Sequence, residues 1–342
     1  MLDDDGLPMD EVGPWAKEKH QRLRRYIDIS RAARRKWVEG QGGATYVDLY
    51  CGAGRAVIRD TGEKIDGSPL VAFKCARDVG VPFSQIHIAD ASEESCRAAE
   101  QRIISVGGSA VTDVGLAEET ARRIVKRLNP YGLHFAFLDP YNLQDLPFSV
   151  IQAFSSLKYV DILIHVSAQD LQRNLDSYSR PGDGPLDTFA PGWRTAVDLR
   201  QSQAATRAAF IAYWASKIEA LGLPPAQRAE LVSGTTRNQR LYWLVFVSRS
   251  DFAKGYGTRS GICPGNAILY DMRSASVGHW NKHRMDRGDV ESDRRLQNCL
   301  ARVQQLLCHA HGSPTSGNGH GEVRRHHSQI WPSPCLDRAR EC

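Results

Sequence analysis

The stretch VDLYCGAGR, residues 47–55, decides the fold of this chain. It joins the end of an apolar, β-branched run, which closes on Asp48, to a Gly-x-Gly turn made by Gly52 and Gly54. Glycines at a strand-to-helix turn let a ligand approach the backbone where a Cβ atom would clash. Open parallel sheets bind ligands just beyond the carboxyl ends of their strands. The stretch therefore predicts a buried strand followed by a ligand-binding turn; a turn without a ligand is the alternative.

Five apolar runs, of which this stretch contains the first, predict the strands of one sheet. They are rich in β-branched and aromatic residues and nearly continuously apolar, which is typical of strands buried on both faces of a parallel sheet. The predicted strands are residues 45–50, 85–90, 110–113, 134–139 and 161–166. Helical patterns separate them, so the expected fold class is α/β, with a doubly wound, mostly parallel Rossmann-like sheet.

Beyond the fifth strand the regular alternation ends. Residues 181–192 are half Gly and Pro, which predicts an irregular loop within an insertion expected at about 169–203. A long amphipathic helix is expected around 204–221. Residues 230–235 and 241–248 are then expected to close the sheet as an antiparallel pair.

Charge is distributed unevenly near the amino terminus. Residues 1–14 contain five acidic residues and no basic one, and we expect this segment to be flexible. Residues 15–40 contain nine Lys and Arg against three acidic residues, so a basic helix is expected there. Its Trp15, Tyr26 and Trp37 either pack on the sheet or, with the basic side chains, form a surface for an anionic partner such as nucleic acid.

The expected α/β domain covers residues 15–250. Residues 251–308 form a C-terminal extension, and residues 309–342 are low in complexity and expected to be disordered. The sequence contains no run of about 18 apolar residues that would predict a membrane span, and its acidic start does not resemble a secretion signal. We therefore expect a cytoplasmic chain without a membrane partner.

The eight cysteines indicate neither a metal centre nor a disulfide framework. No two of them are spaced as Cys-x-x-Cys, and no quartet of Cys and His has the spacing of a zinc site. In a chain without a secretion signal, such cysteines are expected to be free thiols. We expect no metal.

Two further acidic residues end predicted strands. Asp90 ends the second strand, where its carboxylate can accept hydrogen bonds from both hydroxyls of a ribose. Asp113 ends the third strand, where it can meet the amino group of an adenine. Each could instead be a solvated turn residue or a helix cap, which are the commoner roles of a single Asp.

The glycine turn itself favours one class of cofactor. It lacks the GK[ST] of nucleoside-triphosphate loops and the third glycine of dinucleotide-binding folds. An acid followed by Gly-x-Gly instead resembles the S-adenosylmethionine (SAM) turn of class I methyltransferases. Because Asp48 and Asp90 are far apart for a compact nucleotide-binding fold, residues 56–67 are expected to form an extra loop near the site.

The fourth predicted strand ends in Asp139-Pro140-Tyr141. This triplet resembles the Asp/Asn-Pro-Pro-aromatic motif of amino-group methyltransferases, in which oxygen acceptors hold the target amine and the aromatic ring stacks on its base. The sequence has one proline where that motif has two, and a strand end followed by an ordinary Pro-Tyr turn is the structural alternative.

Taken in order, these motifs resemble the three-Cys-motif partner protein family, TcmP. The resemblance is carried by DLYCGAGR (48–55), DGSPL (66–70), FLDPYNL (137–143) and QDLQRNLDSY (169–178), and it extends over about residues 15–248. It implies a class I methyltransferase-like fold. It also implies, as partner, the radical-SAM-like protein with three cysteines after which the family is named. This chain has no Cys-x₃-Cys-x₂-Cys and would be the partner of that protein.

Two functional hypotheses of different classes follow. The first is SAM-dependent methyl transfer to an amino group, with a nucleobase as one candidate acceptor. Its cofactor-binding residues are Asp48, Gly52, Gly54, Asp90 and Asp113, and its catalytic residues are Asp139, Pro140 and Tyr141. The second is a catalytically silent methyltransferase-like module that binds the three-Cys-motif protein or nucleic acid. The missing third glycine disfavours NAD-dependent chemistry.

Overall fold

The computed structural model describes residues 1–180, 184–224, 230–233 and 240–249. The C-terminal extension expected at 251–308 and the tail expected at 309–342 lie outside the described residues. Within these ranges, no helix is long and apolar enough to cross a membrane.

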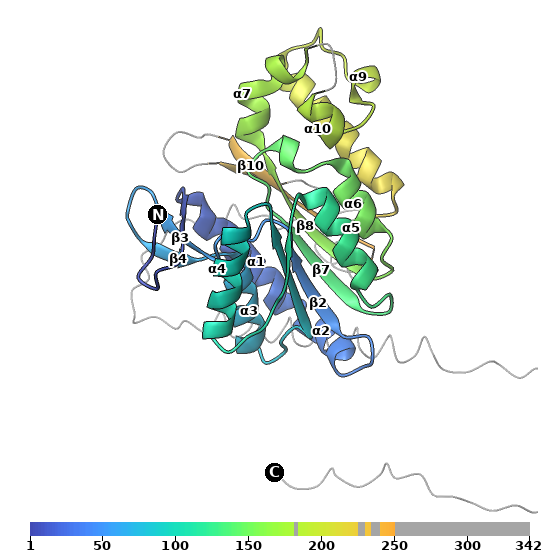
Figure 1. Cartoon of the computed structure of the whole chain (residues 1–342). Coiled ribbons are helices and arrows are strands. Elements are labelled where there is room, and N and C mark those ends of the chain that lie inside the picture. Colours follow the sequence, from blue (N-terminus) through green and yellow to red (C-terminus); the bar gives the residue numbers. More distant parts are fainter. Residues whose placement is uncertain (181–183, 225–229, 234–239, 250–342) are drawn as a thin grey trace, which may run out of the picture. The chain divides into compact units, whose positions relative to one another are not determined.

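A seven-stranded sheet forms the framework of the described chain (Figure 1). Its order is β6-β5-β2-β7-β8-β10-β9; neighbours from β6 to β8 are parallel, and β10 runs antiparallel to both β8 and β9. The strands are β2 (Ala44–Asp48), β5 (Gln85–Asp90), β6 (Val111–Val114), β7 (Leu133–Leu138), β8 (Val160–Ser167), β9 (Glu230–Ser233) and β10 (Arg240–Ser248). All of them lie close to their expected bounds. The predicted fold class is confirmed: this is a doubly wound, mostly parallel, Rossmann-like α/β sheet.

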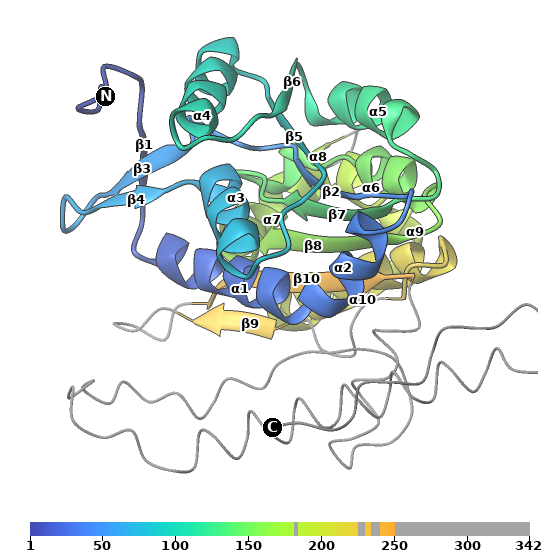
Figure 2. The same ribbon diagram turned by 90° about the horizontal axis from the view of Figure 1, so that it is seen from below.

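Helices cover both faces of the sheet (Figure 2). One face carries α1 (Trp15–Ile29), α3 (Ser68–Asp78) and α4 (Glu93–Ser105), and the other carries α5 (Ala117–Arg127), α6 (Phe148–Ser155) and α10 (Gln203–Ala220). Successive strand residues point to opposite faces. Tyr46 accordingly belongs to the apolar cluster under α1 and α3, and Val47 to the cluster under α5 and α6. This alternation decides which strand-end side chains can meet.

Residues 1–14 are packed on the domain, in contrast to the flexible segment expected from the sequence. β1 (Asp10–Val12) pairs in parallel with β3 (Arg55–Ile58), and β3 forms an antiparallel hairpin with β4 (Lys64–Asp66). The extra loop expected at 56–67 is therefore replaced by part of a second, three-stranded sheet. The described domain begins with the first residues of the chain.

Ion pairs explain why the acidic segment is held in place. The side chain of Asp3 is fully buried and lies 2.7 Å from the charged nitrogens of both Lys64 and Arg55. The hydrogen bond from Lys64 outweighs the effect of burial and keeps the pKa of Asp3 well below its ordinary value. A run of like charges favours disorder when no opposite charges lie near it in the fold. Here basic side chains from distant segments neutralise the acidic segment.

The basic stretch forms two helices, α1 and α2 (Arg31–Val38), separated at Ser30. Tyr26 stacks on Phe135 of the sheet, with 3.9 Å between ring centroids. Arg34 is also buried and donates hydrogen bonds to backbone carbonyls. Core packing, one of the two alternatives for the aromatic residues of this stretch, is therefore confirmed for Tyr26.

The insertion contains a helix where the sequence predicted an irregular loop. Its elements are α7 (Ala168–Tyr178), α8 (Pro185–Phe189) and α9 (Trp193–Ala196). Phe189 of α8 is fully buried and stacks on Trp214 of α10, with 4.9 Å between ring centroids. Leu186 and Phe189 lie one turn apart and are both buried, so packing of this apolar face overrides the Gly and Pro content of the segment.

Candidate functional site

The glycine turn after β2 is shaped first by packing. Gly54 has a φ of 78°, and a Cβ atom there would lie 2.9 Å from the backbone of Ala99 in α4. A Cβ atom on Gly67, just before α3, would lie 2.8 Å from the carbonyl carbon of Gly54. The two glycines thus bring α3 and α4 against the turn, which is a structural reason for Gly54.

Asp48, the first predicted cofactor residue, lies beneath this turn. Its side chain accepts hydrogen bonds from the Tyr46 hydroxyl at 2.9 Å and from the Tyr50 backbone N–H at 3.2 Å. Ser68, in the first turn of α3, also hydrogen-bonds to it. The residue is completely buried, and burial raises the pKa of its carboxyl to about 7. Asp48 therefore links the strand end, the turn and the start of α3 from the inside.

Asp90 connects the end of β5 to the same turn. Its Oδ2 accepts the backbone N–H of Gly52 at 3.1 Å, and its Oδ1 accepts the N–H of Ser92 at 2.9 Å. A carboxylate offers about four acceptor positions, so positions remain for two further donors. Asp90 is only partly buried and makes no ion pair among the described residues. It fits the role of binding the two hydroxyls of a ribose.

Asp113, which the sequence assigned to the cofactor site, does not join this cluster. In the register of β5 and β6, Ala89 pairs with Asp113 and Asp90 pairs with Val114. Since side chains alternate along a strand, Asp113 points to the opposite face from Asp90. There it forms ion pairs with Arg123 and Arg127 of α5.

Apolar side chains stand where the adenine contact was expected. Val114 ends β6 beside Asp90 and is 43% exposed, and Leu116 is 66% exposed. Exposed apolar residues beside a polar strand end are typical of ligand sites, whose walls are mainly apolar. The sequence prediction missed them because it ended this strand one residue too early.

The triplet Asp139-Pro140-Tyr141 lies at the end of β7, next to β2. The Lys19 ammonium nitrogen of α1 is 2.6 Å from Asp139 Oδ2, and the His165 Nδ1 atom of β8 is 3.4 Å from Asp139 Oδ1. Burial raises the pKa of Asp139, but the attraction of Lys19, its hydrogen bond and the neighbouring histidines together outweigh burial. The pKa therefore lies below its ordinary value, and the carboxyl is ionised at neutral pH. Burial lowers the pKa of His165 to about 4, so its imidazole is neutral there.

The other two residues of the triplet differ in exposure. Pro140 is buried, whereas Tyr141 is 92% exposed. No ring contact involves Tyr141 among the described residues. Its aromatic face is available to a ligand outside the fold.

Three functional candidates were missed by the sequence reasoning. Lys19 and His165 flank Asp139, and Asp10 of β1 accepts the backbone N–H of Ala53 in the glycine turn at 2.8 Å. Each of them meets a partner that is distant in the sequence, so no local motif marks it. The one available signal was that the acidic and basic amino-terminal stretches directly precede the first strand.

These groups surround the point where the strand order reverses. Chain order leads from β2 outward to β6 and then returns to β7, so the glycine turn and Asp139 lie on either side of the switch point. In doubly wound sheets ligands bind at this place. Asp48, Asp90 and Asp139 all face the α1 and α3 side. No group of His, Cys, Asp or Glu in the described part of the chain could hold a metal ion.

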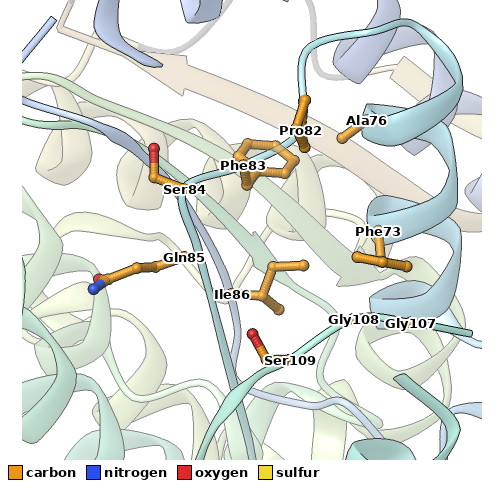
Figure 3. Close-up of a pocket in the computed structure, with 10 residues that line it drawn as sticks. All are labelled: Phe73, Ala76, Pro82, Phe83, Ser84, Gln85, Ile86, Gly107, Gly108 and Ser109. Atoms are coloured by element: carbon orange, nitrogen blue, oxygen red, sulfur yellow. The ribbon is translucent and has the colours of Figure 1, made fainter. Parts of the chain in front are cut away.

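A cavity of 270 Å³ lies elsewhere (Figure 3). Phe73 of α3 and Ile86 near the start of β5 line it, together with the Gly107–Gly108 turn and uncharged neighbours. It opens at the amino end of β5, whereas Asp90 lies at the carboxyl end. It contains no charged side chain and is separate from the candidate site.

Among the solved structures similar to this chain is the O-methyltransferase from Bacillus cereus in complex with SAH. It is 14% identical over 71% of this chain and 85% of that one, with a TM-score of 0.42. The N-methyltransferase NodS from Bradyrhizobium japonicum WM9 is 10% identical over 72% and 92%, with a TM-score of 0.36. An rRNA methylase from Streptococcus thermophilus is 12% identical over 68% and 93%, with a TM-score of 0.33. No protein-family model and no curated protein matches the chain.

Proposed function

We propose that this chain is a SAM-dependent methyltransferase. The observation that carries the proposal is the hydrogen bond between Asp90, at the end of β5, and the Gly52 amide of the turn after β2. It places a carboxylate with spare acceptor positions beside a glycine turn, at the switch point of a doubly wound sheet. The exposed Val114 and Leu116 give the same edge an apolar surface suited to a purine.

Each residue of the site would have a role set by its position. Asp90 would hold the ribose hydroxyls, the Gly52 turn would pass close to the cofactor, and Asp48 would keep the turn in shape from beneath. When bound, SAM supplies a methyl group activated by a positively charged sulfur. Transfer of that group requires alignment of the acceptor with it, so we assign catalysis mainly to positioning.

We propose an amino group as the acceptor, with a nucleobase as one candidate. Asp139 already accepts a charged amine, that of Lys19, which supports an amine-binding role for this carboxylate. The exposed ring of Tyr141 offers a face on which a base could stack, as in proteins that bind single-stranded nucleic acid.

The second candidate function is a silent module of the same fold that binds a three-Cys-motif protein or nucleic acid. The same ion pair favours it, because Lys19 occupies the carboxylate that an acceptor amine would need. The two candidates differ in whether the chain binds SAM and transfers its methyl group.

Isothermal titration of the full chain with SAM and with S-adenosylhomocysteine tests the cofactor assignment. We expect micromolar binding of SAM and a loss of about tenfold or more in Asp90→Asn, since hydrogen bonds to a charged group are worth about 1.5–3 kcal/mol. Asp113→Asn is the matched control, because this strand-end carboxyl faces the other side of the sheet; its affinity should stay within about twofold. A folded wild-type chain that binds neither ligand would contradict the proposal.

Tyr141→Ala tests the acceptor side separately. We expect SAM affinity to be unchanged and methyl transfer to fall about tenfold or more, because stacking on an aromatic side chain contributes about 1–3 kcal/mol per base. The assay follows labelled methyl groups from SAM into single-stranded DNA and RNA oligonucleotides. Tyr131→Ala removes another exposed tyrosine, 72% accessible, and should leave transfer intact. Equal losses in both variants would argue against a specific stacking role.

A further inference from the structure

Asp10 brings a second carboxylate to the glycine turn. Its Oδ2 accepts the N–H of Ala53 at 2.8 Å, one residue after the amide that Asp90 accepts. A Cβ atom on Gly52 would lie 2.5 Å from this same oxygen, so any larger residue there would push the Asp10 carboxylate away from the turn. Asp10 Oδ1 receives no hydrogen bond from the described residues. The residue is exposed to solvent.

The position of Asp10 is determined by the fold. β1 pairs with β3 through Asp10 and Ala56, directly beyond the glycine turn. Arg102 of α4 is almost completely buried and donates to the carbonyl oxygens of Pro8 and Ala53, both at 2.7 Å. One guanidinium group therefore ties the amino-terminal segment and the glycine turn together. The contact between Asp10 and the turn is part of this arrangement.

The electrostatics of the turn favour a cation. Desolvation by the atoms around its carboxyl and the nearby charge of Asp90 raise the pKa of Asp10 above its ordinary value. Neither carboxylate forms an ion pair within the described ranges. Two carboxylates that form no ion pair in these ranges thus contact successive amides of the turn, those of Gly52 and Ala53. A ligand that carries both ribose hydroxyls and an ammonium group would satisfy both.

We propose that the Oδ1 atom of Asp10 binds the ammonium group of the methionine moiety of SAM. This inference rests on the proposed function. The amino-terminal segment, residues 1–14, is then one wall of the cofactor site. Asp90 recognises the ribose, and Asp10 recognises the amino-acid end. In the rival, autoinhibitory arrangement, Asp10 accepts the Ala53 N–H that the carboxylate of the ligand would otherwise accept, and so weakens binding.

Two ligands separate these arrangements in one titration experiment with the full chain. SAM carries the amino-acid group, whereas 5′-methylthioadenosine retains the adenosine and the thioether and lacks that group. We expect Asp10→Asn to weaken SAM binding about tenfold and to leave binding of methylthioadenosine within about twofold. Retained methylthioadenosine binding also shows that the variant is folded. Glu11→Gln is the control, since Glu11 is the next residue of β1 and pairs with Arg59 at the surface; it should change neither affinity.

Each other outcome has a definite meaning. Unchanged or tighter SAM binding by Asp10→Asn overturns the inference, and tighter binding indicates the autoinhibitory contact. Equal weakening of both ligands also overturns it, because Asp10 would then support the turn without recognising the ammonium group. A wild-type chain that binds neither ligand refutes the methyltransferase proposal itself. Equal SAM affinity of wild type and Asp10→Asn, the unchanged binding named above, refutes only the role of Asp10.

Discussion

Arg102→Leu is expected to lower the free energy of unfolding by about 3 to 5 kcal/mol. The Arg102 side chain is 1% exposed and donates to both carboxylate oxygens of Asp5, at 2.8 and 2.9 Å, and to the carbonyls of Pro8 and Ala53. Its loss leaves these acceptors without their donor, and Asp3 loses one of its cationic neighbours. Urea unfolding followed by circular dichroism measures the change.

The matched control for this prediction lies five residues earlier on the same helix. Arg97 is exposed and pairs with Glu93 at i,i+4, so Arg97→Leu should cost at most about 0.5 kcal/mol. Hydrogen exchange in Arg102→Leu should rise first in residues 1–14, which lose their anchor. A stability loss below about 1 kcal/mol, or exchange that rises uniformly, would show that the segment is held by other contacts.

Asp48→Asn is expected to remove a large part of the pH dependence of stability. Burial raises the pKa of Asp48 to about 7 in the folded chain, against an ordinary value of 3.8. The folded state therefore binds this proton more tightly than the unfolded state. The resulting stabilisation is complete below about pH 4 and is lost as the pH rises to about 7. A shift of this size corresponds to about 4 kcal/mol.

The measurement is urea unfolding of wild type and Asp48→Asn at several pH values between 4 and 8. Burial lowers the pKa of His87 and His165 to about 4, which stabilises the fold as the pH rises, so the comparison must be made between the two proteins. The stability of the variant relative to wild type should increase by about 4 kcal/mol across this range. Asp78→Asn, a substitution at an exposed carboxyl, should follow wild type. Parallel curves for Asp48→Asn would contradict the expectation.

A buried carboxyl such as Asp48, which destabilises the fold when it is charged, is typical of a functional site. Asp48 is hydrogen-bonded to Tyr46, Tyr50 and Ser68, so its cost is partly offset by the turn that it organises. Sites that bind ligands commonly retain groups that lower stability. Asp48 belongs to the proposed cofactor site in that sense, through the turn that it supports.

The strand-end residues show how accurately local sequence patterns predict the position of a side chain. Asp90 was predicted correctly as a strand end, because the run 85–90 is apolar up to that residue and followed by a cap at Ser92. Asp113 was expected by the same argument to end the third strand, but that strand continues to Val114, and the side chain of Asp113 faces α5. With a side-chain period of two, an error of one residue moves a side chain across the sheet.

The sequence by itself determined the chain order of the strands in the seven-stranded sheet, its doubly wound arrangement and the glycine turn beside Asp90. These follow from apolar periodicity and from glycine geometry, which act between neighbours in the chain. Only the tertiary structure decided that the acidic residues 1–14 are held by Arg102, that Lys19 and His165 flank Asp139, and that Asp10 meets the glycine turn. Such contacts join charges from distant segments. Their partners are selected by how the helices and strands pack, and no local pattern contains that information.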